Sequence, residues 1–306
     1  MIQVLYNGVD VTNDISVNRC YHDMYAEGRS DTLYIRFNDI SNIWDRWKPK
    51  NGDEINVVYG SIRTGTMFVY SILPKNGLYA IKAMSAPMSA FVNRNKAWRK
   101  VTLLQIATEI AIRHGLTLVN QGVSDYLYDY ILQNNESDFA FLHKRCILEG
   151  CAFLVFDKKL VIYSQASMEQ QSAGEKVVLG LDGNYLYNDK SDMLYGKCRI
   201  ECGKYAGEFI ADSENENVYI PQIDTFIGNK SEAMRFSKGM LREANKGAYT
   251  GYLKGNIQPQ YAAASVLNVE NDRAPSWNGN VYATHIRNNY ATGRTKIFFR
   301  KPLEGY

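Results

Sequence analysis

The sequence is poor in proline and contains no long hydrophobic run. It has only 7 prolines, against 22 tyrosines and 23 glycines, a balance that favours strands and tight turns over helices. No stretch approaches the roughly 18 consecutive apolar residues that a membrane-spanning helix needs. The start of the chain, MIQVLYNGVDVT, has no basic segment followed by an apolar run. We therefore expect neither a signal peptide nor insertion into a membrane.

An excess of charge of one sign is also missing. The 35 lysines and arginines nearly balance the 32 aspartates and glutamates, which leaves a net charge of +3. So small a charge does not indicate a nucleic-acid partner, and we expect no specific nucleic-acid binding. Hydrophobic residues make up 45% of the chain and charged residues 22%, as in folded globular proteins. At ~150 residues per domain, the length suggests about two domains.

Motifs that carry chemistry are absent, since the sequence has no glycine-rich phosphate loop, GxSxG, HExxH or paired CxxC. The spacing of Cys146 with Cys151, and of Cys198 with Cys202, would permit a zinc site. The apolar surroundings of these positions instead favour small core residues, as they do for free cysteines in general. We therefore expect no metal site.

The histidines do not assemble an active site in the sequence. His143 precedes Cys146 by one helical turn and could imitate a base beside its nucleophile, but no third group is placed to orient the pair. His22 and His285 are isolated, and His114 is explained by a favourable charge interaction at a helix C-terminus. We predict no catalytic, cofactor-binding or metal-binding residue and no enzymatic activity.

Residues 1–95 have the pattern of a first β domain. Asn7-Gly8 is typical of a tight hairpin turn. In DTLYIRFND, the apolar Leu33, Ile35 and Phe37 alternate with more polar residues, as in a half-buried strand. Several such segments at short spacing are typical of a small barrel or sandwich. INVVY and MFVY are apolar on both faces, which favours assembly, so Val57→Asp should block assembly or folding.

Residues 96–165 predict a small α+β domain. In VTLLQIATEIAIRHG, apolar residues recur at helical spacing. Thr102 and Gln105 fit a capping box, and Gly115 fits a C-terminal cap. A second helix is expected at about 136–149, with Asn135 as its N-cap and Phe139 on its buried face. The hairpin CAFLVF to LVIYS completes this domain.

Residues 166–306 predict a second β domain. SQASMEQQSAGE is polar and is interpreted as a linker or exposed loop. Alternating segments such as KCRIECG and TKIFFRK follow, interrupted by a helix near 230–245 that stops at Gly247. The sequence therefore predicts a mainly β protein in which an α+β insert lies between two β regions.

Three segments, taken together, resemble the phage baseplate hub proteins of the late control gene D type. The opening barrel of that family is similar to SDTLYIRFNDISNIWDRWKPKNGDEINV, and its linker and following helix are similar to NKAWRKVTLLQIATEIAIRHGLTLV. The most specific match is QNNESDFAFLHKRCILEGCAFLVFDKKLVIYS. The residues there that fall in the family pattern are Gln133, Asn135, Glu136, Ser137, Asp138, Phe139, Phe141 and Leu142. Order and spacing hold across about residues 30–165.

The resemblance implies two tube-like β-barrels that flank the small α+β domain, in a homotrimer that presents six barrels. It implies a structural baseplate hub that joins the hexameric tail tube to the trimeric central spike of a phage tail or a phage-tail-like particle (tailocin). Such a hub assembles in the bacterial cytoplasm and then belongs to the virion or particle. Its implied partners are the tail tube or a tube-initiator protein, the central spike, and further baseplate wedge and tape-measure proteins. Bacterial valine-glycine repeat spike proteins share this hub architecture.

The residues themselves leave a second class of function open. Four tryptophans and 22 tyrosines, interleaved with charges, would also suit a carbohydrate-binding tail or surface adhesin. A trimeric ring would favour the hub, whereas a monomer with affinity for glycans would favour the adhesin.

The cysteine pattern leads to a first testable prediction. Because four of the five cysteines lie on apolar faces of predicted elements and no export signal is visible, we expect neither stoichiometric zinc nor a disulfide. Elemental analysis should find no bound metal, and thiol titration of the denatured chain should find every cysteine free. One metal ion per chain would contradict this and direct attention to Cys146, Cys151, Cys198 and Cys202.

Overall fold

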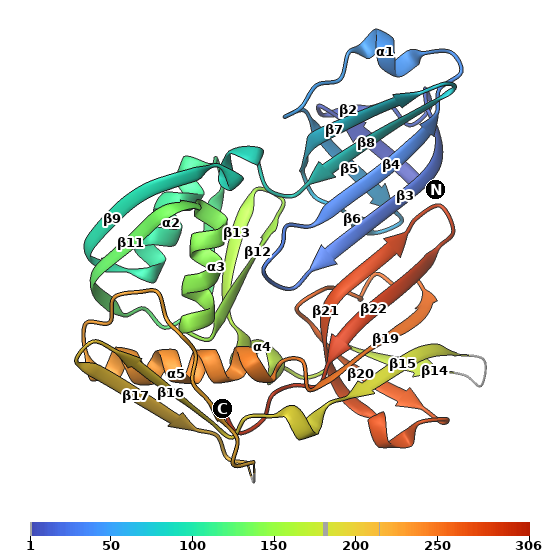
Figure 1. The fold of residues 1–306 in the computed structure, drawn as a ribbon. Helices are drawn as coiled ribbons and strands as arrows, with labels where there is room; N and C mark the ends of the chain where they lie inside the picture. The colour runs from blue at the N-terminus through green and yellow to red at the C-terminus, as the bar shows by residue number, and fades with distance from the viewer. Residues whose placement is uncertain (1, 180–182, 214) are drawn as a thin grey trace.

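The computed structural model describes residues 2–179, 183–213 and 215–306, which form three lobes (Figure 1). The N-terminal strands form the upper lobe, helices α2 (Leu103–Arg113) and α3 (Asp138–Leu148) lie in the lobe at the left, and the C-terminal strands form the lobe at the lower right. The fold is mainly β with few helices, as predicted. No closed barrel is detected among the described residues, so the arrangement of two barrels stays a prediction.

The first lobe is an antiparallel β structure with one short helix. Asn7 and Gly8 turn the chain with φ of 47° and 79°, as the hairpin requires. Val57 is fully buried in the core of this lobe, so its burial needs no partner chain. The elements of the lobe are β1 (Ile2–Tyr6), β2 (Val9–Asp10), β3 (Ser16–Tyr25), β4 (Thr32–Asn38), α1 (Ile43–Trp47), β5 (Glu54–Tyr59), β6 (Ile62–Arg63), β7 (Met67–Lys75) and β8 (Leu78–Met84).

The middle lobe packs two helices against two small sheets. Strands β10, β13 and β12 form one sheet, and β11 pairs with β9 in the other. Its elements are the 3₁₀ helix η1 (Met88–Phe91), β9 (Asn93–Thr102), α2 (Leu103–Arg113), β10 (Thr117–Gln121), β11 (Leu127–Ser137), α3 (Asp138–Leu148), β12 (Cys151–Phe156), β13 (Lys159–Ser164) and α4 (Gln165–Glu169).

The helix starts test the capping predictions. The capping box of Thr102 and Gln105 at the start of α2 is confirmed. The prediction of Asn135 as the N-cap of α3 is wrong, because β11 continues through Ser137 and the Ser137 side chain accepts the hydrogen bond from the Ala140 N–H. Asn135 instead lies at an irregularity in the pairing of β11 with β9, with φ of 49°.

The segment that the sequence suggested as a linker connects the middle lobe to the third lobe. Residues 165–169 form α4, with Gln165 and Glu169 buried, so the interpretation as an exposed loop is wrong there. The predicted helix over 230–245 is confirmed as α5 (Lys230–Asn245). The elements after α4 are β14 (Glu175–Leu179), β15 (Asn184–Asp189), the 3₁₀ helix η2 (Ser191–Met193), β16 (Lys197–Cys202), β17 (Tyr205–Ile210), β18 (Val218–Tyr219), α5 (Lys230–Asn245), β19 (Tyr249–Asn256), β20 (Val266–Asn271), the 3₁₀ helix η3 (Pro275–Trp277), β21 (Gly279–Asn289) and β22 (Arg294–Arg300).

Part of the C-terminal half packs on the middle lobe. Ile200, Phe236 and Leu241 share one hydrophobic core with Phe139 and other residues of the middle lobe. Helix α5 lies along the small sheet of β17, β16 and β18 and also contacts α3. A Cβ atom at Gly239 would lie 2.3 Å from the carbonyl oxygen of Ile147, so only glycine permits this approach of α5 to the end of α3.

One sheet runs through the first and third lobes. Its strand order is β15-β19-β22-β21-β3-β4-β8-β7-β5-β1-β2, and each neighbouring pair on this path is antiparallel. The two lobes meet where β3 pairs with β21, with Tyr21 opposite Asn289 and Tyr25 opposite His285. Segments more than 250 residues apart in the sequence therefore lie side by side.

Phe139 provides a test of the middle-lobe core. It is 5% exposed and packs edge-on against Phe91 and Phe153. We expect Phe139→Ala to lower the free energy of unfolding by about 3–5 kcal/mol, because it leaves a cavity where an aromatic ring was buried. Chemical denaturation measures this. Phe156, which is 41% exposed, is the matched control, and an equal loss in Phe156→Ala would contradict the assignment.

Candidate functional site

Asp138 is the centre of a buried polar cluster in the middle lobe. Its fully buried carboxylate lies at the start of α3 and accepts hydrogen bonds from Gln133 at 3.0 Å and from Arg113 and His114 at 2.8 Å. Burial raises the pKa of Asp138, but these donors outweigh the effect and hold the pKa below its ordinary value. The cluster ties the start of α3 to the end of α2 and to β11.

The same cluster contains a serine, a histidine and an aspartate that form a chain of hydrogen bonds in space. The hydroxyl of Ser89 lies 2.9 Å from Nδ1 of His114, whose Nε2 lies 2.8 Å from Asp138. This order resembles the relay of a hydrolase, which sequence reasoning missed because the three residues come from η1, α2 and α3. Asp138 already accepts hydrogen bonds from Arg113 and Gln133. Ser89, His114 and Asp138 do not line any of the three described cavities, so no described cavity gives a substrate access to them. A packing role accounts for all of these contacts.

A second buried cluster joins the middle and third lobes around Glu169. The Glu169 carboxylate accepts hydrogen bonds from Arg242 at 2.8 Å, from Arg300 at 2.5 Å and from the backbone N–H of Leu303 at 2.7 Å. All three charged side chains are at most 3% exposed. Burial raises the pKa of Glu169, but Arg300 and Arg242 together hold it below its ordinary value. We call this cluster the Glu169 junction.

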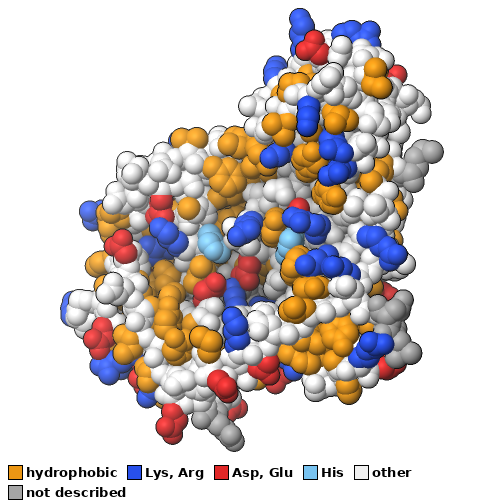
Figure 2. Space-filling view, turned by 45° about the vertical axis from the view of Figure 1, so that its right-hand side comes forward, with side chains coloured by type: hydrophobic (Ala, Val, Ile, Leu, Met, Phe, Trp, Pro, Cys, Tyr) orange, Lys and Arg blue, Asp and Glu red, His pale blue; other side chains and the backbone are white. Residues whose placement is uncertain are grey.

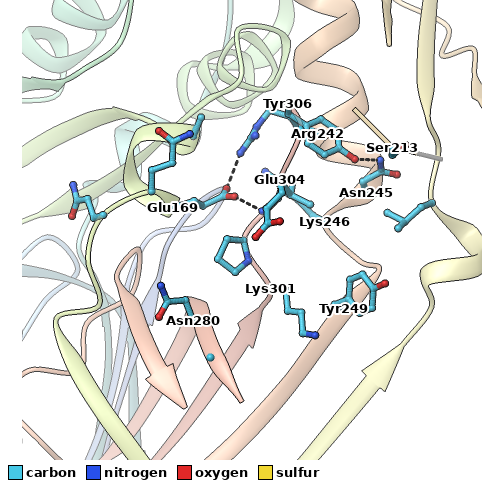
Figure 3. Close-up of a pocket in the computed structure, with 18 of the residues that line it drawn as sticks. Glu169, Ser213, Arg242, Asn245, Lys246, Tyr249, Asn280, Lys301, Glu304 and Tyr306 are labelled. Atoms are coloured by element: carbon cyan, nitrogen blue, oxygen red, sulfur yellow. Dashed lines mark hydrogen bonds and ion pairs between the residues drawn. The ribbon is translucent and has the colours of Figure 1, made fainter. Parts of the chain in front are cut away.

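The Glu169 junction borders a cavity of about 1000 Å³. Figure 3 shows Glu169 facing Arg242, and Tyr306 beside Asn245 of α5, with which it forms a hydrogen bond. Residues 301–306 run from β22 across this cavity to α5. The junction thus holds two guanidinium groups on one carboxylate. The Nε atoms of Arg242 and Arg300 have no hydrogen-bond partner among the described residues.

The third feature is the exposed face of the sheet that joins the first and third lobes. The register of the eight strands from β15 to β7 places eight lysines and arginines on the side opposite the cores of the first and third lobes. Among the paired residues of these eight strands that the structure describes, Asp23 is the one carboxylate on that side. We call this surface the basic face, and its cations are Arg19, Arg36, Lys75, Lys82, Lys254, Arg287, Arg294 and Lys296. Arg300, also on this side of β22, is buried in the Glu169 junction and is not counted.

Aromatic side chains cross the basic face in a row. The rings of Tyr25 and His285 stack with centroids 4.4 Å apart, and those of His285 and Phe298 stack at 4.7 Å. The ring of Tyr252 continues the row, and Lys296 lies 3.7 Å from its centroid. In Figure 2, basic side chains gather with hydrophobic ones in a band where the upper and lower right lobes meet.

The structure also places the other residues that the sequence singled out. Cys20, Cys146, Cys151 and Cys198 are buried and Cys202 is half-buried, all as free thiols. No group that could hold a metal ion occurs among the described residues. His143 is packed against Gly28 in the first lobe, and His285, which looked isolated, hydrogen-bonds Asp23 at 2.7 Å. No described helix is both long and apolar enough to cross a membrane.

Comparison with known proteins identifies the fold. No protein-family model matches the chain, and no curated protein matches it. The prophage MuSo2 tail protein from Shewanella oneidensis has a TM-score of 0.75 at 14% identity, with 98% of each chain covered. A tail protein from Neisseria meningitidis has a TM-score of 0.77 at 10% identity, with 98% of this chain and 95% of that chain covered.

A secretion protein shares the fold as well. The Escherichia coli c3393 protein, a component of the type VI secretion system, has a TM-score of 0.65 at 9% identity, with 99% of this chain and 78% of that chain covered. All three identities are too low to establish a shared function. The TM-scores establish that this chain has the fold of these tail proteins and of a type VI secretion-system component.

The Glu169 junction leads to a prediction about stability. Glu169→Gln keeps the shape of the side chain but leaves two buried guanidinium groups without an anion, so we expect the free energy of unfolding at pH 7 to fall by about 3–5 kcal/mol. Because the pKa of Glu169 is lowered by folding, its stabilisation is complete above the unfolded pKa of ~4.3 and is lost as the pH falls through the folded pKa.

Urea denaturation at several pH values tests this. The difference between the parent and Glu169→Gln should narrow below pH ~4.3. The control is Glu270→Gln, which removes the exposed ion pair with Lys176 and should cost less than about 1 kcal/mol. If both variants lose the same small amount, the Glu169 junction does not hold the lobes together.

Proposed function

We propose that this chain is a structural baseplate hub of a phage tail or phage-tail-like particle, a homotrimer that joins the hexameric tail tube to the trimeric central spike. The proposal extends the fold shared with phage tail proteins and the resemblance of residues 30–165 to baseplate hubs. Within it, residues 1–95 and 166–306 supply the tube-like domains, and 96–165 lie outside them. Residues 195–248, which pack on the middle lobe, form an excursion from the second of these domains.

The observation that carries the proposal is the continuous run of eight antiparallel strands from β15 to β7. Each half of the run, β7-β8-β4-β3 and β21-β22-β19-β15, belongs to one lobe, and the halves meet edge to edge at β3 and β21. Because the number of strands is even, the two end strands run in opposite directions. Copies placed head to tail can therefore continue the antiparallel pattern without a break.

Both ends of the run present open edges. On one side of β15, the described residues contain no paired strand. At the other end, β5 pairs only with Phe68 and Met67 of β7, which leaves residues 71–75 open on the side away from β8. Three chains would bring 24 strands (3 × 8). At ~4.8 Å per strand and a tilt of about 40°, these close into a cylinder roughly 48 Å across at the backbone.

The ring so formed repeats six similar four-stranded units, two from each chain. Such a ring offers six-fold quasi-equivalent contacts to a tail tube or tube-initiator protein and three-fold contacts to a spike. Baseplate wedge and tape-measure proteins are further proposed partners, and the virion or tail-like particle is the proposed location. The proposed role is structural, with no catalytic, cofactor-binding or metal-binding residue.

The oligomeric state tests this proposal. Native mass spectrometry of the purified chain, and imaging of the assembled particle, should find a trimer. Ile72→Pro should reduce the trimer, because it removes an N–H that we place on the open edge of β7, two residues before Pro74. Proline is tolerated in strands where its nitrogen points away from the ladder, and residues 72 and 74 point to the same side.

The control is Ile72→Ala, which loses the same half-buried side chain but keeps the backbone N–H. We expect Ile72→Ala to assemble like the parent and both variants to show native circular dichroism. A chain that is monomeric or dimeric in the mature particle would refute the hub proposal. A monomer that binds glycans on an array would support the carbohydrate-binding adhesin instead.

A further inference from the structure

The charge of this protein is strongly separated in space. The basic face carries eight cations and one carboxylate, a net charge of +7, whereas the whole chain carries +3. The rest of the molecule therefore carries −4 (3 − 7). Apart from Arg287, which pairs with Asp23, none of these eight cations forms an ion pair with another described residue.

Several of these cations lie directly opposite one another. Lys254, Lys296 and Arg287 form one row across β19, β22 and β21, and Arg19 lies opposite Arg36 on β3 and β4. Like charges opposite each other on a sheet destabilise it. Burial lowers the pKa of Lys296, and repulsion from Lys254 and Arg287 lowers it further. An anion bound over this row would relieve the repulsion.

The remaining side chains favour a nucleic acid over a protein as the source of that anion. Protein interfaces are depleted in lysine at an apolar core, whereas nucleic-acid interfaces are polar and strongly positive. On the basic face the rings of Tyr25, His285 and Phe298 stack on one another, which leaves less ring surface for a base. The large exposed apolar side chains of this face, Leu73 and Leu186, lie on its two end strands, β7 and β15. Asn184, Asn256 and Asn289 add amide groups of the kind that bind phosphate oxygens.

We propose that the basic face binds the phosphate backbone of duplex nucleic acid without reading its sequence. The cations supply the binding energy through release of counterions from the duplex. This interaction goes beyond the proposed hub role and requires only the β3–β21 pairing within one chain. In a ring of the proposed kind, the eight-stranded runs would make this face a continuous surface.

Fluorescence anisotropy of a labelled random-sequence duplex, titrated with the full-length chain at several salt concentrations, tests this proposal. We expect binding that weakens with salt as a straight line in log Kd against log salt. Lys254→Ala/Arg294→Ala should reduce the slope by about 1.8, because each lost phosphate contact accounts for about 0.9. Two duplexes of different sequence should bind equally.

The control variant, Lys159→Ala/Lys204→Ala, removes two exposed cations outside the basic face and should leave the slope unchanged. No binding by the parent, or an equal loss of slope in both variants, would refute the proposal. Equal affinity for polyglutamate of matched charge would also refute it, in favour of an acidic protein partner. Native mass spectrometry of the same samples and imaging of the particle separate the two proposals. Duplex binding by a chain that is monomeric both in solution and in the particle would refute the trimer and uphold this inference.

Discussion

The pairing of β3 with β21 is the contact on which the rest of this structure depends. It consists of backbone hydrogen bonds between segments near opposite ends of the chain, from Tyr21 opposite Asn289 to Tyr25 opposite His285. Asp23 reinforces it with side-chain bonds to His285 and Arg287, both at 2.7 Å. Without this pairing, the first and third lobes would be separate sheets, and neither an eight-stranded run nor a basic face would exist.

The Glu169 junction also holds distant parts of the chain together, mainly through side-chain ion pairs rather than through strand pairing. Two arginines from α5 and β22 converge on one carboxylate from α4, and the chain after β22 adds a backbone N–H. A buried ion pair adds little net stability compared with apolar packing, but losing one partner is costly. The junction therefore fixes which elements meet, and it explains why a polar segment that resembles a linker is buried.

The Asp138 cluster shows how a sequence motif relates to structure. The run Asn135 to Phe139 stands out in the sequence because it combines helix-start residues with an aromatic core residue. In the structure Asp138 is buried and binds His114, Arg113 and Gln133. The residues on either side of Asp138 also have structural roles, since Ser137 caps α3 and Phe139 packs in the core. The motif is therefore explained by the assembly of the middle lobe.

The sequence by itself determined the local structure: the turn at Asn7-Gly8, the capping box of Thr102 and Gln105, the helix over 230–245 and the burial of Cys146, Cys151 and Cys198. These features depend on residues close together in the chain and on hydrophobic periodicity. The N-cap of α3 was misplaced because strand pairing extended β11 past Asn135. Only the tertiary structure decided that a chain of net charge +3 has a face of net charge +7. The sum of charges is a property of the composition, whereas their separation depends on strand register, which alone sets which side chains share a face.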